Sequence, residues 1–262
     1  MKICKYVALL CILVLMTACA VLDTTNFDTA RSLGDNRYEW MIGYGKAIDM
    51  NRMVYTPYED DETFNGVQAQ NDHMVNVRYN RGLSASTDLQ FSTTLPTTFS
   101  AKVAFKKRLN AEDQKVMLAV KPAVFFATGS KPRMINLWGD ETDPGEDWTY
   151  ANLGGEISLY ITLSHEFLTN TSGANTDKPR ISMTLAPKLM FSSLSYKRAT
   201  DEDPIDRGTY RSLIPVVSVT PELRWRGISL RPELTGYMVK VKNGKTTLLG
   251  SVNFGIAMEY GK

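Results

Sequence analysis

The sequence predicts an all-β fold in which about ten antiparallel strands close into a transmembrane β-barrel behind an N-terminal signal peptide. Apolar and polar residues alternate with a period of two in about ten successive segments, as they do in strands with one apolar face. After the first twenty residues, no stretch approaches the roughly 18 consecutive apolar residues of a membrane-spanning helix. Long and short connections between the segments alternate, as in barrels of the bacterial outer membrane. Barrels of eight or twelve strands are the alternatives.

The first twenty residues have the composition of a signal peptide. Lys2 and Lys5 are followed by an apolar run from Tyr6 to Met16 and then by small residues. The run is shorter than the roughly 20 apolar residues that cross a bilayer as a helix. We therefore predict that residues 1–18 direct export and are removed.

Two cleavage patterns overlap at the end of this segment. Met16-Thr17-Ala18-Cys19 resembles a lipobox, whose cysteine becomes a lipidated N-terminus, whereas Ala18-Cys19-Ala20 fits ordinary signal peptidase. The three cysteines all lie within the first 19 residues, which favours lipid attachment at Cys19 over an incidental small residue. The prediction is a lipid-anchored linker over residues 19–36 and a barrel domain over residues 37–262.

The charge balance excludes one class of partner. Removal of residues 1–18 takes away two lysines and leaves 28 basic and 28 acidic residues, so the mature chain has no net charge. A nucleic-acid partner requires a basic face, and none is expected here. Without a cysteine after position 19, the mature domain has neither a disulfide nor a thiolate metal site, and we expect no cofactor.

In each predicted strand, every second residue is mostly apolar, and these residues would face lipid. In chain order these sets are Tyr38, Trp40, Ile42 and Tyr44; Val75, Val77 and Tyr79; Leu89 and Phe91; Ala101, Val103 and Phe105; Val116, Leu118 and Val120; Ile157, Leu159, Ile161 and Leu163; Ile181, Met183, Leu185, Leu189 and Phe191; Leu213, Val217, Val219, Leu223 and Trp225; Ile228, Leu230, Leu234 and Met238; and Val252, Phe254, Ile256, Met258 and Tyr260. Polar residues and glycine dominate the opposite parity.

The connections predict which end of the barrel faces out. The predicted outer loops are 50–72, 96–98, 128–151, 193–211 and 241–245, and the inner turns are 83–87, 110–114, 167–178 and 226–227. Most of the long connections fall at one end, which predicts that both termini are periplasmic. Proline has no backbone N–H to pair, so some of the prolines in strand patterns are expected near the rims, where strands outrun their neighbours: Pro122, Pro187, Pro215, Pro221 and Pro232.

Three stretches resemble uncharacterised bacterial outer-membrane β-barrel proteins. The first runs from Thr29 to Gly34 (TARSLG), and the second comprises Arg81-Gly82-Leu83-Ser84 followed by Asp88-Leu89-Gln90. The third, Val252 to Tyr260, is similar to the aromatic-ended C-terminal strand that the barrel assembly machinery recognises. The resemblance implies that the partners are this machinery, outer-membrane lipid and lipopolysaccharide, and it carries no assigned chemistry.

The residues that are predicted to face inward include charged side chains of both signs. The predicted lumen-facing charges are Arg78, Lys102, Lys106, Lys121, Lys188, Glu222, Arg224, Arg231, Glu233 and Glu259. In a ten-stranded barrel such side chains can nearly fill the lumen as an ion-paired plug. The alternative is a narrow, weakly anion-selective pore.

No pattern in the sequence predicts an enzyme. Asp72-His73 lies at the predicted outer rim without a recognisable nucleophile. In Ser164-His165-Glu166, neighbouring strand residues point to opposite faces, so the serine and the histidine cannot readily act together. The acidic loops at 58–72 and 139–147 lack the spacing of a calcium loop, and we interpret them as solvated surface.

Three functional hypotheses follow. The first is an outer-membrane β-barrel lipoprotein with a structural, binding or narrow-pore role. The second is a periplasm-facing lipoprotein whose soluble β-barrel or sandwich binds an apolar ligand, and the third is an outer-membrane lipid-modifying enzyme. The first is favoured by aromatic residues near the predicted strand ends, as in interfacial girdles: Trp40, Trp138, Trp148, Trp225, Tyr44, Tyr79, Tyr150 and Tyr260.

Overall fold

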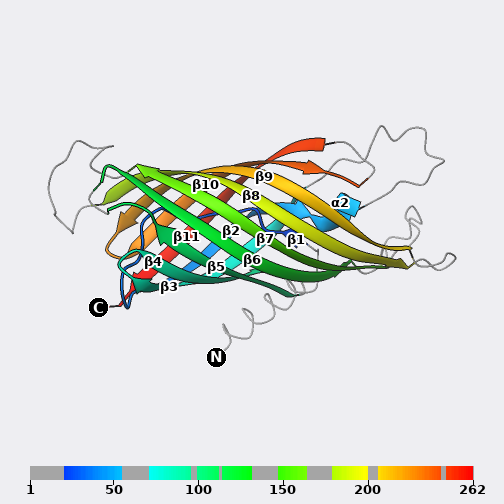
Figure 1. Cartoon of the computed structure of the whole chain (residues 1–262), viewed down its shortest axis with the longest axis horizontal. Coiled ribbons are helices and arrows are strands. Elements are labelled where there is room, and N and C mark those ends of the chain that lie inside the picture. The colour runs from blue at the N-terminus through cyan, green and yellow to red at the C-terminus, as the bar shows by residue number, and fades with distance from the viewer. Residues whose placement is uncertain are drawn as a thin grey trace, which may run out of the picture.

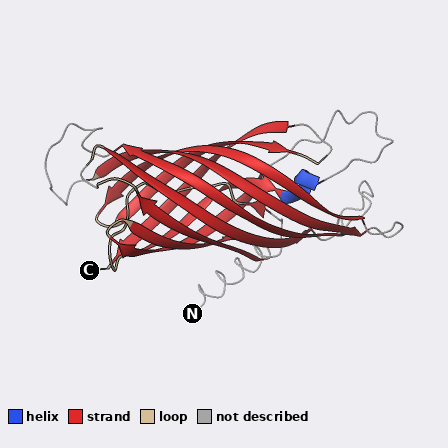
Figure 2. Ribbon diagram, in the orientation of Figure 1, coloured by secondary structure: helices blue, strands red, loops and turns tan. Residues whose placement is uncertain are grey.

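A computed structural model describes residues 21–54, 71–95, 99–111, 114–131, 147–163, 179–199, 206–242 and 246–261. Ten long strands form one closed antiparallel barrel (Figure 1, Figure 2). They are β2 (Tyr38–Asp49), β3 (Asn71–Ser84), β4 (Thr87–Leu95), β5 (Phe99–Arg108), β6 (Val116–Lys131), β7 (Asp147–Leu163), β8 (Arg180–Ala199), β9 (Asp206–Trp225), β10 (Ile228–Lys240) and β11 (Thr246–Tyr260). A two-residue strand, β1 (Val21–Leu22), precedes them, and a short helix, α2 (Met50–Val54), follows β2.

The barrel closes between its first and last long strands. Each long strand pairs with its neighbour in the chain, and β11 pairs with β2 from Phe254–Tyr44 to Tyr260–Tyr38. The prediction of an all-β antiparallel barrel of ten strands is confirmed. Within the described residues, no helix has the length and apolar character needed to cross a membrane.

The two ends of the barrel differ in their connections. At the turn end, which contains Tyr38 and Tyr260, two-residue turns join β3 to β4 and β9 to β10. At the loop end, which contains Asp49 and α2, residues 55–70 and 132–146 connect long strands. Figure 1 shows the C-terminus at the left end of the barrel and α2 at the right end.

The outer surface of the barrel is apolar. All ten predicted apolar sets lie on the outside, where Ile42, Val124 and Val252 are 62%, 64% and 72% exposed. The residues that alternate with these apolar sets along each strand are buried and largely polar. Large apolar areas do not persist on monomeric soluble proteins, whereas an apolar outer band is the rule for barrels in a bilayer.

None of these five prolines lies at the end of its strand, so the expectation that some lie near the rims is wrong. Each one coincides with an interruption of the pairing on one side of its strand. The β9–β10 pairing skips from Leu223–Leu230 to Val219–Leu234, and Pro221 and Pro232 occupy the gap. Pro122 lies in a gap of the β5–β6 pairing, Pro187 lies in one of the β7–β8 pairing, and Pro215 lies just beyond the last β9–β10 pair. Each proline therefore lies where the pairing on one side is already interrupted, so its missing N–H is tolerated although the barrel has no edge strand.

Aromatic side chains gather on the outside of the turn end. Tyr38 stacks on Tyr260 with ring centroids 5.6 Å apart, and Trp40 lies 4.9 Å from the ring of Tyr79. Such rings suit the interface between hydrocarbon and headgroups. Tyr150 is different, because its side chain is buried inside the barrel, so its predicted place in an outer girdle is wrong.

Candidate functional site: a filled lumen

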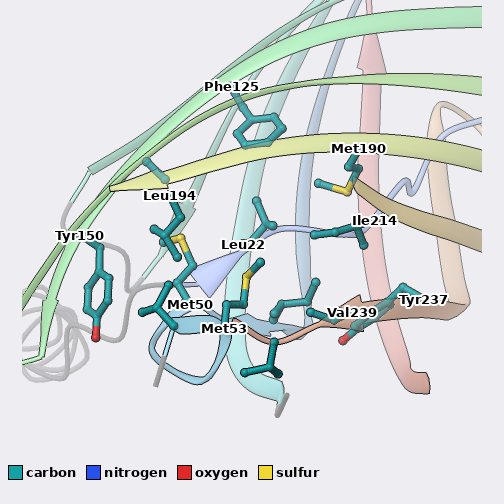
Figure 3. Packing of buried hydrophobic residues seen from close by; sticks show 14 of the residues in the cluster. Leu22, Met50, Met53, Phe125, Tyr150, Met190, Leu194, Ile214, Tyr237 and Val239 are labelled. Atoms are coloured by element: carbon teal, nitrogen blue, oxygen red, sulfur yellow. The ribbon is translucent and has the colours of Figure 1, made fainter. Parts of the chain in front are cut away.

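The loop-end half of the lumen is filled by apolar side chains. After β2 the chain turns inward as α2, and Met50, Met53 and Val54 are fully buried. They pack with inward-facing residues of β6 to β10 in one cluster (Figure 3). The cluster comprises Leu22, Ile48, Met50, Met53, Val54, Phe125, Ala127, Tyr150, Met190, Leu194, Tyr196, Ile214, Val216, Tyr237, Val239 and Val241. The start of the predicted outer loop 50–72 therefore closes the barrel from within.

Residues 21–36, which we call the N-terminal plug, run through the lumen to the turn end, where Asp35 and Asn36 are exposed. Val21 and Leu22 pair with Asp49 and Ile48 at the loop end, where β2 extends past its last partner in β11. The plug then runs to the turn end and enters β2 at Tyr38. Nearly all of its residues from 21 to 33 are buried. A linker in front of the barrel was predicted over residues 19–36, whereas residues 21–33 lie within the barrel.

The two buried acidic residues of the plug, Asp23 and Asp28, meet lysines of the wall. Asp28 lies 3.0 Å from the ammonium of Lys106 and 3.3 Å from that of Lys121. Asp23 lies 3.7 Å from the ammonium of Lys102. These side chains are almost completely buried, and buried charges persist in proteins when they are paired and hydrogen-bonded. The plug therefore neutralises part of the basic excess of the wall.

Wall side chains also satisfy the backbone of the plug. Because this segment has no regular secondary structure beyond β1, its N–H and C=O groups need other partners. The Glu233 carboxylate accepts hydrogen bonds from the backbone N–H of Asn26 and of Phe27, at 2.9 and 2.5 Å. The Lys188 ammonium donates to the Thr24 carbonyl at 2.8 Å, and Arg78 donates to the Asn26 carbonyl.

Phe27 fixes the plug to the seam between β2 and β11. Its ring lies against Gly43 of β2 and Gly255 of β11, and a Cβ atom at Gly43 would come within 2.5 Å of that ring. Met41 and Ala257 complete the contact. The backbone of Phe27 has a φ of 41°, in the left-handed region that non-glycine residues rarely adopt. The inward glycines of the seam thus form the recess that holds this side chain.

Arg231 joins the plug to two strands of the wall. Its guanidinium donates to the Glu39 carboxylate at 2.6 and 3.0 Å and to the Glu222 carboxylate at 3.0 Å. It also donates to the backbone carbonyl of Phe27 at 3.2 Å. A planar guanidinium can meet several acceptors at once, which a lysine ammonium at this place would not do in the same geometry.

At the turn end the plug is held by a second set of polar contacts. Glu259 of β11 lies 3.0 Å from Arg31 and 3.1 Å from both Arg37 and Arg224. Ser32 donates a hydrogen bond of 2.7 Å to the Asp88 carboxylate.

Two of the stretches that resemble outer-membrane barrel proteins therefore meet here. A Cβ atom at Gly82 would lie 1.7 Å from the Gly34 carbonyl oxygen, so the TARSLG stretch packs directly on the RGLS stretch.

All ten predicted lumen-facing charges point into the barrel, eight of them buried and Arg224 and Glu259 half-buried. The structure brings them together mainly through the plug, whereas the prediction was that they pair with each other. Asp23 and Asp28 in the plug and Asp88 and Glu156 in the wall were not among the predicted residues. The excess of basic residues over acidic ones at inward positions was the signal for an additional acidic element.

The remaining candidates for chemistry show no catalytic arrangement among the described residues. His73 faces outward and stacks on Tyr44, whose hydroxyl lies 2.8 Å from its Nδ1 atom. Ser164-His165-Glu166, Cys19 and most of both acidic loops lie outside the described residues. No group of three or more metal-ligating side chains occurs in the described part of the chain.

One small cavity lies beside the plug. The cavity between Val21, Lys102 and Phe125 measures about 20 Å³, which is space for about one water molecule. A larger hollow of about 570 Å³ opens at the loop end between Tyr150, Tyr196 and Gly208.

Comparison with known proteins finds similarity only among solved structures, because no family model and no curated protein matches the chain. The N-terminal β-barrel domain of OprF from Pseudomonas aeruginosa is 9% identical, with a TM-score of 0.32 over 87% of this chain and 99% of that one. The translocator domain of the autotransporter NalP from Neisseria meningitidis is 9% identical, with a TM-score of 0.45 over 87% and 89%. The attachment invasion locus protein Ail of Yersinia pestis is 8% identical, with a TM-score of 0.32 over 86% and 99%. These identities are too low for any residue role to be transferred.

Proposed function

We propose that this protein is an outer-membrane β-barrel lipoprotein with a closed lumen, and that its role is structural or binding rather than catalytic. The observation that carries the proposal is the N-terminal plug, which fills the polar half of the lumen and forms ion pairs with its wall. Together with the apolar cluster at the loop end, the plug occupies much of the lumen among the described residues, which supports a closed barrel rather than a porin. The narrow-pore role is therefore the less favoured form of the same hypothesis.

The orientation in this proposal follows from the connections. The short turns beside Tyr38 and Tyr260 belong on the periplasmic side, and the long loops belong outside, next to lipopolysaccharide. The barrel assembly machinery would recognise β11, whose outward residues are apolar and which ends in Tyr260. Removal of residues 1–18 and lipid attachment to Cys19 complete the proposal.

The apolar exterior argues against the second hypothesis, a soluble periplasmic domain. A water-soluble barrel that binds an apolar ligand would have a polar exterior and an apolar interior cavity. This barrel has an apolar exterior and a largely polar interior, and the apolar cluster at its loop end is already packed with the protein's own side chains.

Recording of ionic current across planar bilayers tests the closed lumen. The purified wild-type protein is expected to insert without steady conductance, because the plug and the apolar cluster block the lumen. A variant without residues 21–33 that also carries Met50→Ser and Met53→Ser is expected to give steady channels. Its lysine-rich wall should make these channels weakly anion-selective.

Two results would contradict the proposal. Steady conductance of the wild type would favour the narrow pore. A variant that remains closed, although a heat-modifiability gel shows it to be folded, would mean that the plug and the methionines of α2 are not what closes the lumen.

A further inference from the structure

The direction of the plug has a consequence for the place where the protein is anchored. Val21 pairs with Asp49 at the loop end, while Arg37 and Tyr38 lie at the turn end, so residues 21–36 cross the lumen from one end to the other. Gly261, the last described residue, lies beside Asn36 and Arg37 at the turn end. The first and last described residues therefore lie at opposite ends of the barrel, although the sequence analysis predicted both termini on the periplasmic side.

We infer that the chain ahead of Val21 leaves the barrel at its external mouth, so that the acyl chains on Cys19 enter the outer leaflet of the outer membrane, on the side of lipopolysaccharide. This inference rests on the proposed lipid attachment and on the proposed orientation. It assigns to the N-terminus a place on the cell surface, whereas a linker in front of the barrel would leave the lipid in the inner leaflet.

The height of the barrel wall next to Val21 fits this position. Val21 lines a small cavity with Thr94 and Ser100, which lie near the loop-side ends of β4 and β5. These strands have 9 and 10 residues, whereas β8 and β9 have 20 each. A tilted strand of about 9–11 residues just crosses the bilayer core, so the loop-side ends of β4 and β5 lie at the outer interface. Cys19 is two residues ahead of Val21, within about 7 Å along an extended chain, and its lipid can reach the acyl region there.

The contacts of the plug also explain how it stays in this orientation. Phe27 touches both strands of the closing seam, β2 and β11, and Glu233 binds two consecutive backbone N–H groups of the plug. Lysines from β5, β6 and β8 enclose it on the other side. The seam on one side and these lysines on the other therefore hold the plug in its place in the folded barrel.

Cysteine labelling on intact cells tests the inference. If Cys19 carries lipid, Ala20→Cys introduces a single free thiol into the mature chain, because the three natural cysteines lie at positions 4, 11 and 19. The probe is a polyethylene-glycol maleimide too large to pass through porins. We expect Ala20→Cys to react on intact cells. The matched variant Lys262→Cys is expected to react only after the outer membrane has been permeabilised.

Two further measurements distinguish a failure of the threading through the lumen from a failure of the lipid attachment. An epitope inserted between Ala20 and Val21 should be visible to antibody on intact cells, in protein whose folding is verified by heat-modifiability. Radiolabelled palmitate should enter the wild type and not Cys19→Ala.

If both the Ala20→Cys thiol and the inserted epitope of folded protein are reached only after permeabilisation, the inference is overturned. Reaction of Lys262→Cys on intact cells would overturn it as well, since both ends would then lie on one side. Surface exposure without palmitate would support the threading through the lumen and refute the proposed lipid attachment.

Discussion

Replacement of Arg231 by methionine is expected to destabilise the barrel by about 3–5 kcal/mol, because the change leaves Glu39 and Glu222 buried without their cation. It also removes the hydrogen bond to the Phe27 carbonyl and thereby loosens the plug. The measurement is the urea midpoint of folding into lipid vesicles, followed by the gel shift between folded and unfolded barrel.

Arg37→Met is the matched control for this change. Arg37 also pairs with a glutamate, but its side chain is 47% exposed and Glu259 keeps two other cations. Exposed pairs contribute about 0–1 kcal/mol. In the triple variant Arg231→Met/Glu39→Gln/Glu222→Gln, much of the lost stability should return, because no unpaired charge remains. Equal shifts for Arg231→Met and Arg37→Met would contradict the described role of Arg231.

Ile256→Arg is expected to impair membrane assembly by about 2–4 kcal/mol, the cost of a charge on the lipid face near the middle of the membrane. Ile256 points outward from β11, between Ile42 of β2 and Leu230 of β10. Leu248→Arg has the same parity on the same strand but lies near the loop end, where the expected cost falls to about 0–1 kcal/mol. Ala257→Ser on the lumen side should also cost much less than Ile256→Arg.

The yield of heat-modifiable protein in the membrane fraction measures all three variants. In a water-soluble barrel, Ile256→Arg and Leu248→Arg would both place a charge in solvent and would be tolerated alike. Equal yields for these two variants would therefore contradict the membrane-spanning account.

The strands could be predicted because their signal is local. Period-two alternation decides which residues of β10 or β11 face outward, and the structure keeps this parity even where Pro232 interrupts the pairing. The alternation does not say what lies inside the barrel. The same buried parity holds charged residues toward the turn end and Tyr237 and Val239 toward the loop end, and only the loop-end set packs around α2.

The plug could not be predicted by periodicity, because its conformation depends on contacts far away in the sequence. Asn26 and Phe27 are positioned by Glu233, more than 200 residues later, and Phe27 occupies a recess between glycines of two different strands. Without regular secondary structure, residues 21–36 resemble a linker. The indirect signal was electrostatic: a wall with unmatched lysines needs acidic partners, and Asp23 and Asp28 supply them.

Photo-crosslinking from position 27 tests the plug most directly. A photoreactive phenylalanine analogue at Phe27 should attach, in the folded protein, to peptides that contain Gly43 of β2 or Gly255 of β11, because the ring of Phe27 lies against both. The same analogue at Phe105, which faces outward, should attach to lipid. After unfolding in urea, the products at position 27 should disappear. If position 27 of the folded barrel instead attaches to lipid or to another polypeptide, the N-terminal segment does not lie in the lumen and the closed-barrel account is wrong.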